Sequence, residues 1–98
     1  MYTGSLAVDL MLGDVHSLKE KRSVVRPIVA ELRRKLEVAA AEAGDQDLHR
    51  RALVGVAVVA GDAAQCKRVL DTALRLVEDH PEIQVLSSRQ RFYSLEDE

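Results

Sequence analysis

The chain has 98 residues with 14 basic and 16 acidic side chains, a net charge of −2, and aromatic residues make up 3% of it. This is the size of one domain, and it argues against a surface coated with charge for nucleic acid or anionic membrane and against stacking of several bases on rings. The single cysteine excludes an internal disulfide, and no apolar run approaches the roughly 20 residues that cross a bilayer.

The first predicted element is a strand from Tyr2 to Leu12, where apolar and polar residues alternate. One side of this strand carries Leu6, Val8, Leu10 and Leu12, and the other carries Ser5, Ala7, Asp9 and Met11. The start of the chain, residues 1–5 (MYTGS), lacks the charged region of a signal peptide, so we expect a cytoplasmic protein without a membrane partner.

A helix is predicted after the turn at residues 13–14. Residues 17–20 (SLKE) fit a capping box, in which the serine hydroxyl and the glutamate each satisfy a free backbone N–H. An apolar stripe at helical spacing then comprises Leu18, Val25, Val29, Leu32 and Leu36. Pro27 lies inside this stripe and removes a backbone hydrogen bond, so we expect a kink near residues 23–27 or a helix that is regular only after them.

Residues 37–43 (EVAAAEA) are open to two interpretations. Their helix propensity is high and Gly44 would end a helix well, which favours a helix that continues to Ala43. The alternative ends the helix near Leu36 and places a strand at Val38 to Ala43.

The second half predicts strand, helix and strand. Residues 52–60 (ALVGVAVVA) are apolar on both sides, which is typical of a central strand buried on both faces. Asp62 is predicted to cap the next helix, with Gln65 in the reciprocal position, and Pro81 to end it. The apolar stripe of this helix comprises Cys66, Val69, Leu70, Ala73 and Val77. Residues 83–93 form the last predicted strand.

This order of elements predicts an α+β, ferredoxin-like βαββαβ sandwich with two helices on one face of a four-stranded antiparallel sheet. We expect one domain over residues 1–93 and an acidic flexible tail over residues 94–98. The first and last strands are then neighbours, which brings Tyr2 close to Phe92 and Tyr93. The two central strands carry no aromatic ring on the other face of the sheet. This face either pairs with another protein or with itself, with Ala7 and Met11 as candidate interface residues of a homodimer, or is covered by the helices or the tail.

Charge is segregated along the chain. Residues 16–36 hold seven cations and two acids, a net charge of +5, which leaves −7 for the rest. Lys19, Arg22, Arg26 and Arg33 follow one helical stripe if the helix is continuous. Such a stripe either binds the phosphates of RNA or another polyanion, or lies along the rim of the core with its charged ends in water.

The predicted helix start carries cations at the positive end of the helix dipole, where each is unfavourable by roughly 0.3 to 1 kcal/mol. A local rule broken in this way often marks a functional site. Free N–H groups there would bind phosphate or sulfate, and a histidine just before the cap would add a switchable donor. The candidate anion or RNA site comprises His16, Ser17, Lys19, Lys21, Arg22, Arg26 and Arg33.

Catalysis is not indicated by any motif. None of the three histidines has a second ligand at a supporting spacing, and the glycines are isolated turn residues. Cys66 lies on an apolar stripe, where a structural thiol is expected. We therefore expect no enzyme, no metal, no cofactor and no small-molecule substrate.

Several segments together resemble the YlxP-like family of small bacterial proteins of unknown function. The most specific is His-Ser-Leu-Lys-Glu-Lys-Arg at residues 16–22, and the resemblance extends from Tyr2 to about Arg91. The other matching segments are residues 4–6, 23–24, 41–42, 46–48, 55–59, 69–71 and 77–78. Pro27, and His49 where the family tends to carry a large aromatic residue, depart from its pattern.

The resemblance implies a ferredoxin-like fold, favours the strand at Val38 to Ala43 and implies no established enzymatic activity. Members are often encoded near genes of translation initiation and ribosome maturation. The sequence hypothesis is therefore a non-catalytic protein that binds ribosomal RNA or a ribosome-associated protein through its basic helix. The alternatives are a structural or regulatory homo-oligomer that pairs through the open sheet face and a small anion-sensing domain.

Overall fold

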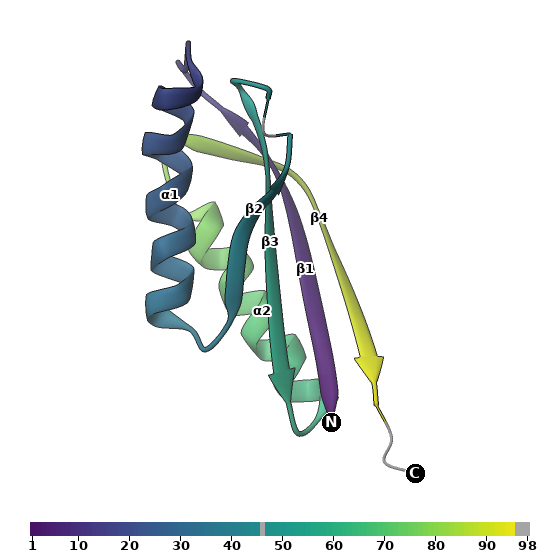
Figure 1. The fold of residues 1–98 in the computed structure, drawn as a ribbon. Helices are drawn as coiled ribbons and strands as arrows, with labels where there is room; N and C mark the ends of the chain where they lie inside the picture. Colours follow the sequence, from purple (N-terminus) through teal and green to yellow (C-terminus); the bar gives the residue numbers. More distant parts are fainter. Residues whose placement is uncertain (46, 96–98) are drawn as a thin grey trace.

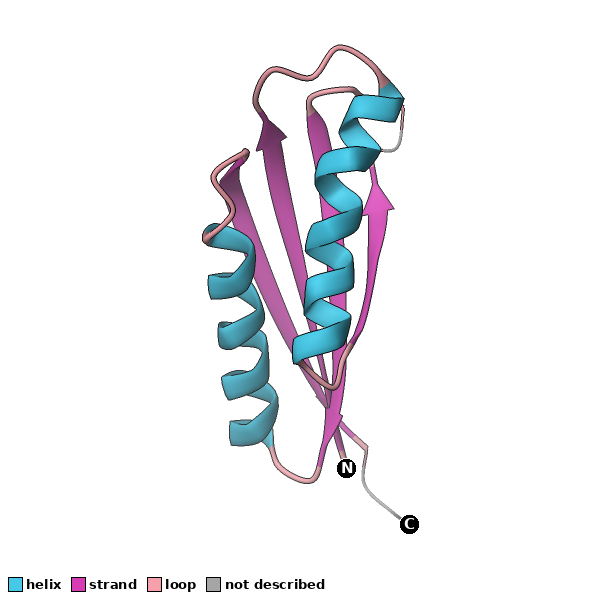
Figure 2. Ribbon diagram, turned by 90° about the vertical axis from the view of Figure 1, so that its left-hand side faces the viewer, coloured by secondary structure: helices cyan, strands magenta, loops and turns pink. Residues whose placement is uncertain are grey.

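Two helices cover one face of a four-stranded antiparallel sheet in a computed structural model that describes residues 1–45 and 47–95 (Figures 1 and 2). The strands lie in the order β2-β3-β1-β4. The elements are β1 (Tyr2–Leu12), α1 (Leu18–Lys35), β2 (Ala39–Gly44), β3 (Arg51–Ala60), α2 (Ala63–Glu78) and β4 (Ile83–Ser94). The predicted ferredoxin-like fold is confirmed.

The core lies between the helices and the covered face of the sheet. The side of β1 predicted to be buried packs there, and so does the matching side of β3 with Val54 and Val56. At Gly4 the second helix comes very close to the strand, since an added Cβ would lie 3.0 Å from the Leu70 side chain. Neither helix within the described ranges has both the length and the apolar character of a membrane span.

Helix α1 runs without a break through Pro27 (Figure 1). The alternative of a helix that becomes regular only after residues 23–27 is therefore wrong. The helix instead begins at Leu18, just after its cap, and its buried side includes Val25, Val29 and Leu32 as predicted. Pro27 itself is exposed, so its ring faces solvent rather than the core.

Of the ambiguous residues 37–43, residues 39–43 lie in strand β2, one residue later than the predicted start at Val38. Leu36 adopts an extended backbone and ends α1, and β2 pairs antiparallel with β3, which places Ala40 in the core. Pairing with a neighbouring strand outweighs the small helix preference of each alanine, which is worth only tenths of a kcal/mol per residue.

Strand β3 is central but is not buried on both faces, and this corrects the expectation from its composition. Ala57 is exposed and Val59 is 66% exposed, whereas their neighbours Val56 and Val58 are buried. Apolar residues on the uncovered side made the strand look like one from a sheet with two covered faces. The structure thus leaves an apolar but open sheet face.

Strand β4 changes its alternation at a β-bulge. Leu10 of β1 pairs with Val85, but the preceding Asp9 pairs with Ser87, so Leu86 has no partner opposite. Before the bulge the odd-numbered residues face the helices; after it the even-numbered ones do, because cross-strand partners share a face. Gln90 accordingly donates a hydrogen bond to Asp71 of α2 (2.9 Å).

The end of β4 lies beside the start of β1, as predicted. Thr3 pairs with Tyr93 and Gly4 with Phe92, which gathers the aromatic residues at one end of the sheet. Ser94 and Leu95 were expected in a flexible tail, but Ser94 pairs with β1 and the Leu95 N–H donates to the Met1 carbonyl. Residues 96–98 lie outside the described residues.

Candidate functional site

Three exposed cations lie on one face of α1. Lys19, Arg22 and Arg26 follow the helix at spacings of three and four residues and surround a shallow hollow of about 410 Å³ that also touches Pro27. Within the described residues none of the three forms an ion pair or a side-chain hydrogen bond. We call these three side chains the basic stripe, and their charges are available to a ligand.

Lys21 does not belong with them, although the sequence places it in the same candidate site. It is 1% exposed, and its ammonium group donates to the carbonyls of Asp45 and Leu48 and lies 2.9 Å from the Glu42 carboxylate. The i+2 position relative to Lys19 turns it towards the sheet. Its role is to hold the loop after β2 against α1, which corrects the sequence prediction for this residue.

The start of α1 is already occupied by groups of the chain itself. The Ser17 hydroxyl accepts from the Glu20 N–H (3.1 Å), and the Glu20 carboxylate accepts from the His16 N–H (3.3 Å) rather than from Ser17. His16 also lies 2.6 Å from the Asp14 carboxylate, and both side chains are exposed. Two carboxylates therefore stand where the predicted anion would bind.

The three cations in the last turn of α1 have different partners. Lys35 pairs with Glu31 (3.0 Å), which also contacts His80 beyond α2 (2.9 Å). Two hydrogen bonds lower the pKa of Glu31 below its ordinary value of 4.5. The bond from Lys35 has the larger effect and the bond from His80 the smaller one. Arg33 uses its Nε to donate to the Ala40 carbonyl at the edge of β2 (2.9 Å), and Arg34 is exposed.

The described residues contain no cluster of three or more side chains suited to hold a metal ion. Cys66 is buried on α2, and its thiol lies 3.7 Å from the Tyr2 carbonyl. The cap of α2 is formed by Asp62, which accepts from the Gln65 N–H (2.7 Å). The Gln65 side chain does not reciprocate but accepts from Arg68.

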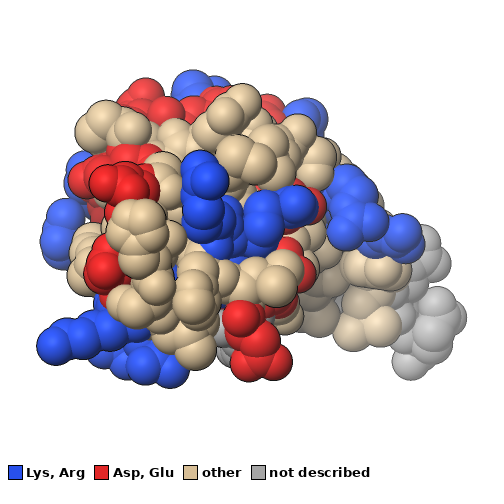
Figure 3. Space-filling view, turned by 90° about the horizontal axis from the view of Figure 1, so that it is seen from above, with Lys and Arg blue, Asp and Glu red and all other residues tan. Residues whose placement is uncertain are grey.

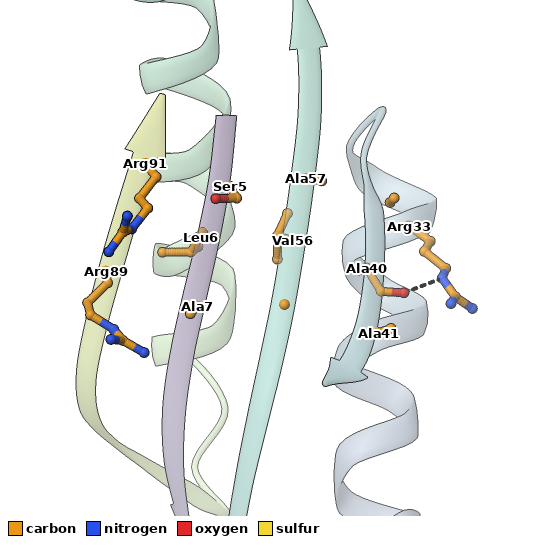
Figure 4. A pocket seen from close by; sticks show the side chains of 12 residues that line it. Ser5, Leu6, Ala7, Arg33, Ala40, Ala41, Val56, Ala57, Arg89 and Arg91 are labelled. Atoms are coloured by element: carbon orange, nitrogen blue, oxygen red, sulfur yellow. Dashed lines mark hydrogen bonds between the residues drawn. The ribbon is translucent and has the colours of Figure 1, made fainter. Parts of the chain in front are cut away.

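The open face of the sheet forms a hollow of about 790 Å³ (Figure 4). Small residues form its floor, and arginines stand on both sides. Its floor residues are Ser5, Ala7, Ala39, Ala41, Gly55 and Ala57, and its arginines are Arg33, Arg89 and Arg91. Of the two predicted interface residues it contains Ala7; Met11 lies towards the far end of β1, beside Gly13 and Arg50.

Arg89 and Arg91 were not among the predicted site residues. Continuing the alternation of Ile83 and Val85 would place both arginines on the helix side, and only the bulge at Leu86 turns them to the open face. The polar pair Ser87-Ser88, which interrupts the apolar start of the strand, is the signal that could have indicated a break in alternation.

Charge on the whole surface is mixed. Seen from above, Lys and Arg side chains lie on the left, in the middle and on the right of the view, and acidic side chains lie among them, mainly on the left (Figure 3). The basic stripe and the arginines of the open face are thus local features of a protein whose net charge is −2.

Comparisons with known proteins agree with this fold. A family model described as "Protein of unknown function (DUF503)" matches residues 3–90. The uncharacterized protein YlxP of Bacillus subtilis (strain 168) is 30% identical over 90 residues, which cover 92% of this chain and 98% of that protein.

Two solved structures are similar in fold. A de novo designed protein with a ferredoxin fold, LFR1 1, has a TM-score of 0.61 at 15% identity and covers 100% of this chain and 96% of its own. SnoaB, a cofactor-independent oxygenase from Streptomyces nogalater solved as the mutant N63A, has a TM-score of 0.54 at 11% identity, covering 98% and 95%. At these identities the likeness concerns the fold alone.

Proposed function

The chain belongs to the DUF503 family of proteins of unknown function, as its resemblance to the YlxP-like family predicts, and from this premise we propose that it is a non-catalytic binding protein for structured RNA. The basic stripe of Lys19, Arg22 and Arg26 is the binding surface. The observation that carries the proposal is that these three exposed cations share one hollow and have no carboxylate partner among the described residues.

The geometry of α1 supports contact with a phosphate backbone. The basic stripe covers seven residue steps, about 10 Å of helix, and Arg34 continues exposed positive charge to the last turn. Phosphates of one strand follow one another at intervals of a few ångströms, so cations at this spacing reach several of them. Each contact releases counterions, which makes the binding sensitive to salt.

Recognition by stacking has little support in this fold. The rings of Phe92 and Tyr93 lie at one end of the sheet, 40% and 58% exposed, and the two central strands present no ring over their middle. A protein that binds through α1 therefore recognises the charge and shape of the RNA rather than unstacked bases. This favours a folded RNA, and we propose ribosomal RNA as its source.

The test is binding of a fluorescein-labelled RNA hairpin, measured by anisotropy at 50 and 200 mM salt. Three phosphate contacts predict that the affinity falls by roughly 20- to 40-fold between these concentrations. The double variant Lys19→Glu/Arg22→Glu is expected to lose at least tenfold in affinity at 50 mM salt and most of the salt dependence, because two contacts become repulsive.

A matched control is available on the other helix. Arg68→Glu/Arg75→Glu makes the same change of charge on exposed positions of α2 and is expected to bind the hairpin nearly as the wild type does. Equal losses in the two double variants would mean that only net charge matters, and the proposal would be rejected. It would also be rejected if the wild-type protein bound the hairpin without salt dependence.

A further inference from the structure

The floor of the open face is made of unusually small side chains. Ala41 on β2, Gly55 and Ala57 on β3 and Ala7 on β1 lie side by side across three strands. At Gly55 an added Cβ would lie 3.3 Å from the Cβ of Ala43, so the neighbouring alanine already occupies the space above the Gly55 backbone. No side chain of these four residues extends beyond its Cβ. A partner can therefore approach the sheet closely and find an apolar surface.

Both sides of this floor carry positive charge. Arg89 and Arg91 stand on β4, and Arg33 stands beyond the edge of β2 (Figure 4). The Nε of Arg33 binds the Ala40 carbonyl, which fixes the side chain and leaves its terminal nitrogens to a ligand. None of the three is ion-paired within the described residues, and no carboxylate lines the hollow.

We infer that the open face docks an amphipathic α-helix of another protein, with the apolar stripe of that helix on the alanine and glycine floor and its acidic side chains paired with the arginines on either side. The charge of the hollow requires an anionic partner, and its apolar floor requires an apolar surface between the two rows of charge. An amphipathic helix with acidic flanks has both properties.

The dimensions of the hollow fit this partner. Three strand intervals separate β2 from β4, about 14 Å, and an α-helix with its side chains is about 10 to 12 Å across. A helix lying along the strands therefore fills the space between the arginines and brings carboxylates on its two flanks to them. Guanidinium groups suit such pairs because they bind carboxylates with two parallel hydrogen bonds.

A second copy of the chain fits this face less well. In a two-fold pair of sheets whose facing strands run parallel, β4 of one copy lies over β2 of the other, and in a pair whose facing strands run antiparallel β4 lies over β4. Either way guanidinium groups meet guanidinium groups. The one carboxylate among the strand residues of this face, Asp9, is already paired with Arg51 (3.0 Å). RNA bases would find no ring on the floor.

The probe is a labelled 18-residue helical peptide with a leucine and alanine stripe between two rows of glutamate. Its twin has lysine in place of every glutamate. We expect micromolar binding of the acidic peptide and at least tenfold weaker binding of the twin. The double variant Arg89→Glu/Arg91→Glu is expected to lose at least tenfold in affinity for the acidic peptide and to gain affinity for the lysine twin. Lack of binding of the acidic peptide by the wild-type protein overturns the proposal.

The floor is tested separately. Ala57→Glu places a charge on an exposed floor position and should abolish binding, while Arg68→Glu/Arg75→Glu on α2 should leave it unchanged. Thermal unfolding of each variant shows that it is folded. If sedimentation shows a dimer that Arg89→Glu/Arg91→Glu disrupts, a second copy occupies the open face and the proposal is wrong. If the RNA hairpin competes with the peptide and Ala57→Glu abolishes hairpin binding, RNA occupies the open face and the proposal is also wrong.

Discussion

The two faces of the sheet are built from the same strands but differ in the size of their side chains. On the covered face β1 and β3 present leucines and valines that the helices bury completely. On the open face the same strands present Ala7, Gly55 and Ala57, and β2 adds Ala39 and Ala41. An ordinary solvated sheet face carries polar residues, whereas the hollow on this face has a floor of small, mostly apolar residues bordered by arginines.

Because of this difference, the covered face contributes most of the stability, whereas the open face is available for interaction. The large residues of the covered face stabilise the fold, because each buried leucine or valine contributes about 1.5 to 3 kcal/mol relative to an exposed one. The small residues of the open face bury little and add little to stability. Changes on the two faces should therefore have very different consequences for the folded chain.

The largest expected effect concerns Lys21, the charged residue buried on the covered side. Lys21→Met keeps the length of the side chain but leaves the Glu42 carboxylate without its ion-pair partner and two backbone carbonyls without their donor. Removal of one partner of a buried pair predicts a loss of about 3 to 5 kcal/mol in the free energy of unfolding, measured by urea unfolding. Lys19→Met, two residues away on the exposed surface, serves as the control and should change the unfolding free energy by less than about 0.5 kcal/mol.

The next effect compares neighbouring residues of β1 that face opposite ways. Leu10→Ala removes a fully buried side chain and should cost about 2 to 5 kcal/mol of unfolding free energy. Met11→Ala, on the half-buried open face, should cost less than about 1 kcal/mol. Equal losses at the two positions would show that the open face is buried in solution, and the contrast between the faces would fail.

The smallest effect concerns the contact between the two helices on the covered side. The pKa of Glu31 is lowered by its hydrogen bonds to Lys35 and His80, so its charged form is stabilised in the folded protein. This contribution is present above pH 4.5 and is lost as the pH falls through the lowered pKa. The difference in Tm between the wild type and Glu31→Gln should therefore be measurable at pH 7 and shrink at pH 3. A difference that is the same at both pH values would contradict it.

The fold was predictable because local and long-range signals agree in most of the chain. The alternation of β1, the cap at Ser17 and the stripe of α1 each indicate the observed element. Residues 37–43 were not decidable from propensity, because the pairing of β2 with β3 lies outside the local sequence. The open side of β3 was misjudged for a related reason: an apolar composition does not say whether a second layer is present.

The candidate site was predictable only in part. The spacing of Lys19, Arg22 and Arg26 sufficed to place them together, since α1 is regular. Lys21 could not be separated from them by charge alone, because its burial depends on the carbonyls of a loop that comes 24 residues later. Arg89 and Arg91 depended on a bulge, which shifts the direction of every side chain after it.

Because of that bulge, the side chains on the open face depend on how many residues β4 holds before them as well as on the residue types. Between Val85 and Ser88 the strand holds one residue more than its neighbour β1 requires. Relatives that differ by one residue in this segment would keep the same arginines in the sequence and yet present glutamine and phenylalanine over the groove. A change of one residue in length at this point would thus exchange a positively charged surface for a neutral one, and it would turn Arg89 and Arg91 towards α2.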